Sequence, residues 1–308
     1  MKKPFKNRKK SVVWSIWLLV SFVSSPPNAG ERFLVDEVGR KVLLPDNPKR
    51  IVSLAPSITE TLFALGLDHE IVGVTNYCDY PAEALKKPRI GGFVNPCIEK
   101  IVSLMPDLVV ATDNGNRRGV VDKLTELAFS VFVTYPKDFD GILRTIENIG
   151  GITGRKREAS RIVREIRIRM EEIINLTKDL EKPRVFLQMG DSPLITIGRD
   201  TFANDLIESA GGLSISRDEP LQYPTYSIEE VLIKEPDIII MTSMNPKKDY
   251  KGLMRRWSQW GSIAAVKRGK VFVVDSDLVD RPSPRIIQGL EELAKIIHPE
   301  IFRGFDKQ

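Results

Sequence analysis

Two segments that lie 130 positions apart in this chain read almost alike. Residues 98–112 are IEKIVSLMPDLVVAT, and residues 228–242 are IEEVLIKEPDIIIMT. Each has an acidic residue at the start of a short helical pattern, a Pro-Asp break, and then an apolar run typical of a buried strand. A unit repeated once at the spacing of a domain predicts two similar α/β lobes. Clefts between lobes commonly hold ligands, so the repeat favours a two-lobed binding protein.

Strand and helix patterns alternate along both halves of the chain, which predicts parallel sheets with helices on their faces. Residues 33–45 read as an N-terminal hairpin that turns at Gly39. Residues 51–55 read as the first buried strand. Ser57 and Glu60 then have the spacing of a capping box at the start of the next helix. The predicted fold class is therefore α/β, with a parallel sheet in each lobe.

One long segment separates the two copies of the repeat. Residues 155–180 are highly charged and carry apolar residues at helical spacing, and Lys182-Pro183 ends the pattern. Its position predicts one long helix that bridges the lobes. The expected organisation is a signal peptide over residues 1–29, an N-terminal α/β lobe over 30–153, a linking helix over 154–182 and a C-terminal α/β lobe over 183–308.

The first 29 residues have the order of a secretory signal. Six basic residues precede an apolar run over 12–23, and Pro26, Pro27, Asn28 and Ala29 follow. The run is shorter than the roughly 20 residues that a spanning helix needs, although an uncleaved anchor is the alternative. No cysteine lies near the expected cleavage after Ala29, so we do not expect a lipoprotein. The predicted location is periplasmic.

The basic character of the chain comes from this N-terminal segment. Without its six basic residues, 40 of the 46 Lys and Arg remain against 41 Asp and Glu, so the mature chain is close to neutral. Such a balance gives no reason to expect nucleic acid as a partner. We expect a monomer.

The two cysteines, Cys78 and Cys97, both lie in predicted loops of the first half. Export would place them in an oxidising compartment, where a disulfide could form. Spacing alone does not decide between a paired and a free state, because the geometry of the two Cα atoms does.

The chain has few of the residue patterns that enzymes and metal sites require. It contains no Gly-x-Ser-x-Gly elbow, phosphate loop or dinucleotide fingerprint. Its two histidines, His69 and His298, are not expected at the cleft, so a zinc or manganese site is not predicted. An exported α/β enzyme remains the alternative class, and we expect neither catalysis nor a cofactor.

Several ordered motifs resemble the periplasmic binding proteins for iron complexes and cobalamin. They are residues 50–60 (RIVSLAPSITE), 77–81 (YCDYP), the segment 98–112 and residues 277–285 (DLVDRPSPR). The resemblance runs from about Phe33 to about Ile297, and the second and fourth motifs are most similar to the cobalamin-binding members. It implies two Rossmann-like lobes joined by a single long helix (a class III binding-protein fold), a ligand between them and little hinge motion.

The resemblance also implies roles for individual residues. Tyr77 is expected to contact the ligand, whereas Tyr80 is more readily explained as packing within its own loop. Phe93 and Tyr223 match aromatic positions of the cobalamin binders, but Asp113 stands where a further aromatic is expected. The expected ligand-binding residues are Tyr77, Phe93, Tyr223, Asp277, Leu278, Val279, Asp280 and Arg281.

Glu99 and Glu229 hold equivalent places in the repeat. An acidic residue in the first turn of a helix is favourable through the helix dipole alone. In the related family the matching pair docks onto arginines of the membrane permease, and we expect these two residues to do the same. The resemblance thus implies a binding protein that delivers cobalamin or a related corrinoid to an ABC permease and its ATPase. Haem or a ferric siderophore is the alternative cargo.

Overall fold

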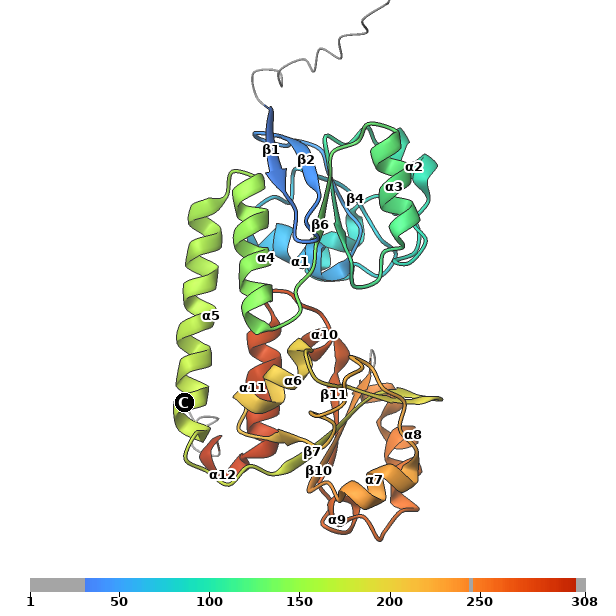
Figure 1. The fold of residues 1–308 in the computed structure, drawn as a ribbon, viewed down its shortest axis with the longest axis vertical. Helices are drawn as coiled ribbons and strands as arrows, with labels where there is room; N and C mark the ends of the chain where they lie inside the picture. Colours follow the sequence, from blue (N-terminus) through green and yellow to red (C-terminus); the bar gives the residue numbers. More distant parts are fainter. Residues whose placement is uncertain (1–30, 244–245, 303–308) are drawn as a thin grey trace, which may run out of the picture.

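The computed structural model describes residues 31–243 and 246–302, which form two α/β lobes beside a long helix (Figure 1). Each lobe is built on a parallel sheet, so the predicted fold class is confirmed. The expected signal peptide lies outside the described residues. Among the described helices, none is both long and apolar enough to cross a membrane.

The first lobe contains a four-stranded parallel sheet in the order β4-β3-β5-β6. Its strands are β3 (Ile51–Ser53), β4 (Ile71–Val74), β5 (Leu108–Thr112) and β6 (Val131–Thr134). Its helices are α1 (Pro56–Ala64), η1 (Ala82–Lys86), α2 (Ile98–Ser103), α3 (Arg118–Glu126) and α4 (Phe139–Ile152). The N-terminal hairpin is made by β1 (Glu31–Val35) and β2 (Lys41–Pro45), as expected from the turn at Gly39. Every residue of β5 is buried, which explains its unbroken apolar sequence.

The second lobe has a sheet in the order β11-β10-β7-β8, with β9 also paired to β7. Its strands are β7 (Arg184–Asp191), β8 (Leu194–Thr196), β9 (Leu213–Ser214), β10 (Ile238–Ser243) and β11 (Val271–Asp275). Its helices are α6 (Phe202–Ser209), α7 (Ile228–Lys234), α8 (Pro246–Ser258), α9 (Ala264–Lys267), α10 (Ser276–Val279), α11 (Ile286–Ile297) and α12 (Pro299–Phe302). The β7, β9, β10 and β11 pairings are parallel, and β8 adds one antiparallel strand beside β7. Only two residues separate the two strands, too few for the crossover that a parallel pair requires.

Helix α5 (Lys156–Thr177) runs along both lobes, beside α4 in the first and α11 in the second (Figure 1). It is shorter at each end than the span 154–182 expected from the apolar pattern. Its buried face joins one apolar cluster that continues through α4, α6 and α11 from the first sheet to the second. Two further clusters each belong to a single lobe. The lobes therefore share a packed layer along one side, and the seam between them opens on the other.

The repeat seen in the sequence extends to matching backbone contacts. In the first lobe, Arg50 Nη2 donates to Leu104 O at 2.6 Å, and Asp107 accepts from the Arg50 N–H at 3.0 Å. In the second lobe, Arg184 Nη2 donates to Lys234 O at 2.6 Å, and Asp237 accepts from the Arg184 N–H at 3.0 Å. In each lobe the arginine therefore satisfies a carbonyl at the end of the repeat helix, and the aspartate fixes the following strand to the central one.

The predicted capping box at α1 is wrong. The N-cap residue is Ala55, Pro56 occupies the first turn, and no side chain of the described residues caps this helix. Proline at this place needs no hydrogen-bond partner for its nitrogen and already has a helical φ angle, so the helix can start without a cap. Glu60, which the prediction used as part of the cap, instead points across the seam between the lobes.

Candidate ligand-binding cleft

A cavity of about 650 Å³ lies in the seam between the two lobes. Its walls come from the segments that follow β3, β4, β5 and β11, together with residues of the second lobe. The carboxyl ends of neighbouring parallel strands meet at one edge of a sheet, which is why these segments gather there. The lining residues are Ala55, Pro56, Ser57, Tyr77, Gly92, Phe93, Val94, Asn95, Thr112, Asn114, Phe202, Tyr223, Ser276, Asp277, Asp280, Arg281 and Pro282.

Six of the eight residues expected to contact ligand line this cavity: Tyr77, Phe93, Tyr223, Asp277, Asp280 and Arg281. The other two, Leu278 and Val279, do not. Val279 is fully buried, and the carbonyl of Leu278 lies so close to α11 that a Cβ on Gly289 would come within 2.2 Å of it. The single turn of α10 directs this pair into the packing against α11, an orientation that the linear motif does not reveal.

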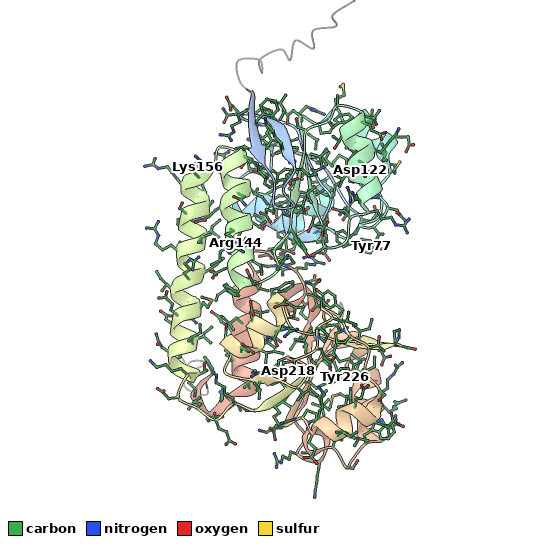
Figure 2. All side chains as sticks on the ribbon, in the orientation of Figure 1. Tyr77, Asp122, Arg144, Lys156, Asp218 and Tyr226 are labelled. Carbon is green, nitrogen blue, oxygen red and sulfur yellow. The ribbon has the colours of Figure 1, made fainter. Side chains whose placement is uncertain are left out.

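Four aromatic residues line the cavity: Tyr77, Phe93, Phe202 and Tyr223. Tyr77 follows the end of β4, and Figure 2 shows it at the edge of the first lobe that faces the second. Tyr77 and Tyr223 are each about half exposed, whereas Phe93 is partly buried against the core. Asp113, which stands where an aromatic was expected, is not among the lining residues, but its neighbour Asn114 is. Such a wall offers broad apolar faces with hydroxyl groups at the edges of the two tyrosines.

The position of Phe93 is fixed by contacts from the loop after β5. Asn116 is buried, and its Nδ2 donates to Phe93 O at 2.8 Å and to Leu54 O at 3.0 Å. The Phe93 ring lies directly over Gly115, where a Cβ would come within 2.2 Å of it. Gly115 also has a φ of +134°, which favours glycine. These contacts hold one aromatic wall in place without a ligand.

Two carboxylates line the same cavity from the second lobe. Burial raises the pKa of Asp277 to about 6, although the Arg281 guanidinium opposes the rise. Burial also raises the pKa of Asp280 to about 7, with the nearby Thr242 hydroxyl opposing it. Within the described residues, neither Asp280 Oδ1 nor Thr242 Oγ1 makes a well-formed hydrogen bond. Asp280 can therefore carry a proton near neutral pH and act as a hydrogen-bond donor in the cavity.

Arg281 is buried and is held by three carboxylates. Its Nη1 donates to Glu60 Oε1 at 2.9 Å and to Asp79 Oδ1 at 2.8 Å, and its Nη2 lies 2.7 Å from Asp277 Oδ1. Glu60 and Asp79 belong to the first lobe, so the guanidinium bridges the seam. Arg281 lines the cavity as predicted, but much of its donor capacity is already used by the protein.

Glu60, Asp79 and Arg285 were not predicted as site residues. Arg285 makes a bidentate pair with Glu60, at 2.9 Å for both bonds, and its guanidinium carbon lies 3.9 Å from the centre of the Tyr80 ring. Tyr80 thus packs against the other lobe rather than only within its own loop. The one sequence signal for this network was a glutamate in the otherwise uncharged helix α1, and that signal was interpreted as a cap.

Comparison with known proteins identifies the family. Residues 51–278 match the model of a periplasmic binding protein family. The chain is 30% identical over 246 residues to the vitamin B12-binding protein of Vibrio cholerae, which covers 80% of this chain and 87% of that protein. It is 32% identical over 275 residues to an uncharacterised ABC transporter substrate-binding lipoprotein, YvrC, of Bacillus subtilis, covering 87% and 86%. The chain belongs to the periplasmic binding protein family.

Solved structures show the same architecture. The crystal structure of the periplasmic vitamin B12-binding protein BtuF of Vibrio cholerae matches with a TM-score of 0.74 at 28% identity, covering 86% of this chain and all of that one. A periplasmic haem-binding protein, RhuT of Roseiflexus sp. RS-1, matches with a TM-score of 0.74 at 22% identity, covering 82% and 99%. The second likeness is evidence of the fold alone. As a member of this family the protein is an extracytoplasmic solute-binding protein and not an enzyme.

In this periplasmic binding protein the two expected docking residues occupy matching, exposed positions. Glu99 is the second residue of α2, and Glu229 is the second residue of α7. The helix starts differ, because Ser227 and Glu230 form a capping box at α7, whereas Cys97 provides no cap at α2. The capping role thus falls to Glu230 and leaves Glu229 exposed at the helix start.

The cysteines of this family member are both free, so the disulfide left open by the sequence is not formed. Cys78 is buried, and its sulfur lies 3.1 Å from the hydroxyls of Thr59 and Thr75. Burial raises the pKa of its thiol. Cys97 lies at the start of α2, where its sulfur donates to Glu99 at 3.2 Å. Each sulfur is therefore directed to partners of its own.

The histidines lie away from the cleft. His298 is buried and contacts Gly211 O, while His69 is exposed beside Asp68. Over residues 31–243 and 246–302, no group of three or more His, Cys, Asp and Glu side chains is arranged to hold a metal ion.

Proposed function

We propose that this protein captures cobalamin, or a related corrinoid, in the cleft between its lobes and delivers it to an ABC importer. The cleft supports this cargo because it combines four aromatic side chains with polar groups from both lobes. A corrinoid presents a broad macrocycle with uncharged amide groups around its rim. Aromatic faces suit the macrocycle, and hydroxyl, amide and carboxyl groups suit the rim.

The charge of the cavity is the observation that carries the proposal. Among the described residues that line it, Arg281 is the one cationic side chain, and three carboxylates hold it. Haem carries two propionate groups and ferric catecholates are anionic, so both would enter a cavity with no free cation. Burying an unpaired charge is unfavourable. The uncharged amide groups of a corrinoid avoid this cost and can accept a hydrogen bond from protonated Asp280.

The relatives support the same assignment. The Vibrio cholerae protein that carries the name vitamin B12-binding protein shares 30% identity over most of both chains. The name of the Bacillus relative supports the ABC transporter as the partner system. In this proposal the permease receives the loaded protein through Glu99 and Glu229, one from each lobe, and the ATPase drives the transfer. Two separated charged contacts would fix the orientation of docking and speed encounter.

Haem is the second candidate because the half-exposed Tyr77 could serve as an axial ligand for iron. The two cargoes differ in absorbance, since bound haem gives a Soret band. Ferric catecholates give a broad visible band and are covered by the same measurement.

Titration of the purified mature chain with cyanocobalamin tests the proposal. We expect a dissociation constant at or below about 1 μM, which corresponds to about −8 kcal/mol. Tyr77→Ala should weaken binding by about threefold to tenfold, because an aromatic contact contributes about 0.5–1.5 kcal/mol. Phe33→Ala is the matched control, since Phe33 and Tyr77 are both 51% exposed and Phe33 lies in the hairpin outside the cleft. Absence of cobalamin binding together with a Soret band after haem addition would overturn the assignment.

A further inference from the structure

The ion-pair network in the seam joins two segments that are more than 200 residues apart in the chain. Its members from the first lobe are Glu60 and Asp79, and its members from the second are Asp277, Arg281, Ser283 and Arg285. We call this set the seam network. Glu60 is 3% exposed and Ser283 is fully buried, so its centre is closed to solvent.

Glu60 is the centre of the seam network because, among the described residues, every hydrogen-bond partner of its side chain comes from the other lobe. Its Oε1 accepts from Arg281 Nη1 and Arg285 Nη2, each at 2.9 Å. Its Oε2 accepts from Ser283 Oγ at 2.6 Å and from Arg285 Nε at 2.9 Å. A carboxylate has about four acceptor sites, so Glu60 is fully satisfied by these bonds. Opening the seam would break them together.

The seam network lies beside the ligand cavity, but only some of its members line that cavity. Glu60 is not among the lining residues, but Arg281 and Asp277 are, and residues 55–57 at the start of the helix that carries Glu60 are as well. Arg285 lies over the Tyr80 ring, which follows Asp79 in the loop after β4. Tyr77 belongs to the same loop. The bonds to Glu60 therefore set how far the aromatic wall of the first lobe stands from the carboxylates of the second.

We propose that Glu60 is a positioning residue that holds the empty cleft at its ligand-binding width by pairing with Arg281 and Arg285 of the opposite lobe. It does not touch the ligand and acts through the two arginines. A second contact across the seam has the same effect, since the Phe139 N–H donates to Asp205 Oδ2 at 3.1 Å. The shared apolar layer of α4, α5 and α11 holds the two lobes together along one side of the molecule. The seam network holds them together beside the cavity.

The energetic argument rests on burial. Among the described residues, Glu60 is the carboxylate that pairs with the partly buried Arg285, whereas Arg281 also pairs with Asp79 and Asp277. Removing Glu60 would leave the Arg285 guanidinium without its carboxylate and Arg281 with one fewer, which is unfavourable for buried charges. In Glu60→Ala the closed form would hold Arg281 and Arg285 without their central partner. Opening the seam would let water solvate both, so the open form becomes the favoured one. The ligand must then first close the lobes, and its apparent affinity falls with the fraction of closed molecules.

Distances between spin labels on the two lobes test the proposal in the absence of ligand. The labels are placed at Asp122→Cys in α3 and Asp218→Cys in the second lobe, which Figure 2 shows on different lobes. Both positions have exposed side chains, and a Cys97→Ser background leaves the buried Cys78 as the one native thiol. We expect a single narrow distance distribution for the parent protein and a longer, broader one for Glu60→Ala and Glu60→Gln. Glu83→Gln, an exposed glutamate of the same lobe, is the matched control and should behave as the parent.

Circular dichroism and thermal unfolding establish whether each variant folds. If Glu60→Ala does not fold, Arg285→Lys carries the test, because lysine keeps the charge but loses the bidentate pair and the ring contact. It should also broaden the distribution. Folded variants whose distributions match that of the parent would overturn the proposal.

Cobalamin affinity provides a second readout, and this arm alone rests on the proposed function. We expect Glu60→Gln to bind about tenfold more weakly than the parent, as follows if about one tenth of the molecules remain closed. Saturating cobalamin should return its label distances to those of the parent. Unchanged affinity in a variant with longer distances would refute the link between lobe separation and binding. A parent protein that fails to bind cobalamin would contradict the proposed cargo, while the distance measurements would still decide the role of Glu60.

Discussion

Asp280 stands in the wall of the cavity at a cost in stability. It lies in the cavity wall, its Oδ1 is closed to solvent, and burial raises its pKa to about 7. In the unfolded chain the same carboxyl would titrate near its ordinary value of 3.8. Between about pH 4 and pH 7, the folded protein therefore keeps a proton that the unfolded chain has lost. The free energy of unfolding must fall as the pH rises through this range.

Asp280→Asn removes this dependence while keeping the shape of the side chain. We expect the variant to be more stable than the parent at pH 8, by up to about 4 kcal/mol for a shift of this size, and the difference to shrink toward pH 4. Thermal unfolding at several pH values measures it. Asp122→Asn, on the exposed face of α3, serves as the control. A stability gain that does not change with pH would contradict the assignment.

Single residues also show what the sequence could and could not predict. Tyr77 and Arg281 were placed at the cleft because they lie in ordered motifs close to strand ends, and Phe93 and Tyr223 because they match aromatic positions of the related family. Glu60 and Arg285 were missed because a pair formed across 225 positions leaves no periodic trace in the sequence. Leu278 and Val279 do not line the cavity although the motif includes them, because a motif records order along the chain and not the direction of a side chain.

Among the elements, α4 and α5 make an unusually close contact at Gly150. A Cβ on Gly150 would lie 2.4 Å from the Cβ of Ala159 and 3.0 Å from Arg155 O, although Gly150 lies inside a helix. Gly151 is its immediate neighbour, and the nearest atom to a Cβ there is Lys156 Cε at 4.0 Å. Both glycines lie inside α4, but Gly150 faces close atoms of neighbouring residues, whereas Gly151 has open space around it.

This difference predicts opposite effects of the same substitution. Gly150→Ala should force α4 and α5 apart and destabilise the protein by about 1–3 kcal/mol, as overpacking does. Gly151→Ala should stabilise it by about 0.5–1 kcal/mol, because alanine has less backbone freedom to lose on folding. Urea unfolding of both variants compares them directly. Equal effects of the two substitutions would show that the helices can separate without cost.

The elements were easier to predict than their ends and directions. The helical pattern over 155–180 identified α5, but its ends were placed outside the observed Lys156–Thr177. The capping box was assigned to α1, whereas the one found among the described residues lies at α7, with Ser227 and Glu230. The helix that starts at Pro56 needs no cap. Ser57 and Glu60 have the spacing of a capping box, but they do not make its hydrogen bonds.

At the scale of the whole molecule, the duplication is most evident in the helices α2 and α7, which present one exposed glutamate from each lobe. We expect Glu99→Ala/Glu229→Ala to reduce cobalamin transport by about tenfold or more while cobalamin affinity is unchanged, because in the proposed function both residues set docking and neither lines the cleft. Uptake into vesicles that contain the importer measures transport, and titration measures affinity. Glu126→Ala/Glu300→Ala removes one exposed glutamate from each lobe at other helices and should leave both quantities intact. A loss of affinity in the first variant would contradict the docking role.

The apolar layer shared by α4, α5, α6 and α11 has a consequence for how often the importer is occupied by protein without ligand. Halves that are fixed to each other present Glu99 and Glu229 at the same spacing whether or not cargo is present. Unloaded copies would then occupy the membrane complex about as readily as loaded ones. Producing more of the protein than there is ligand to carry would slow uptake rather than speed it.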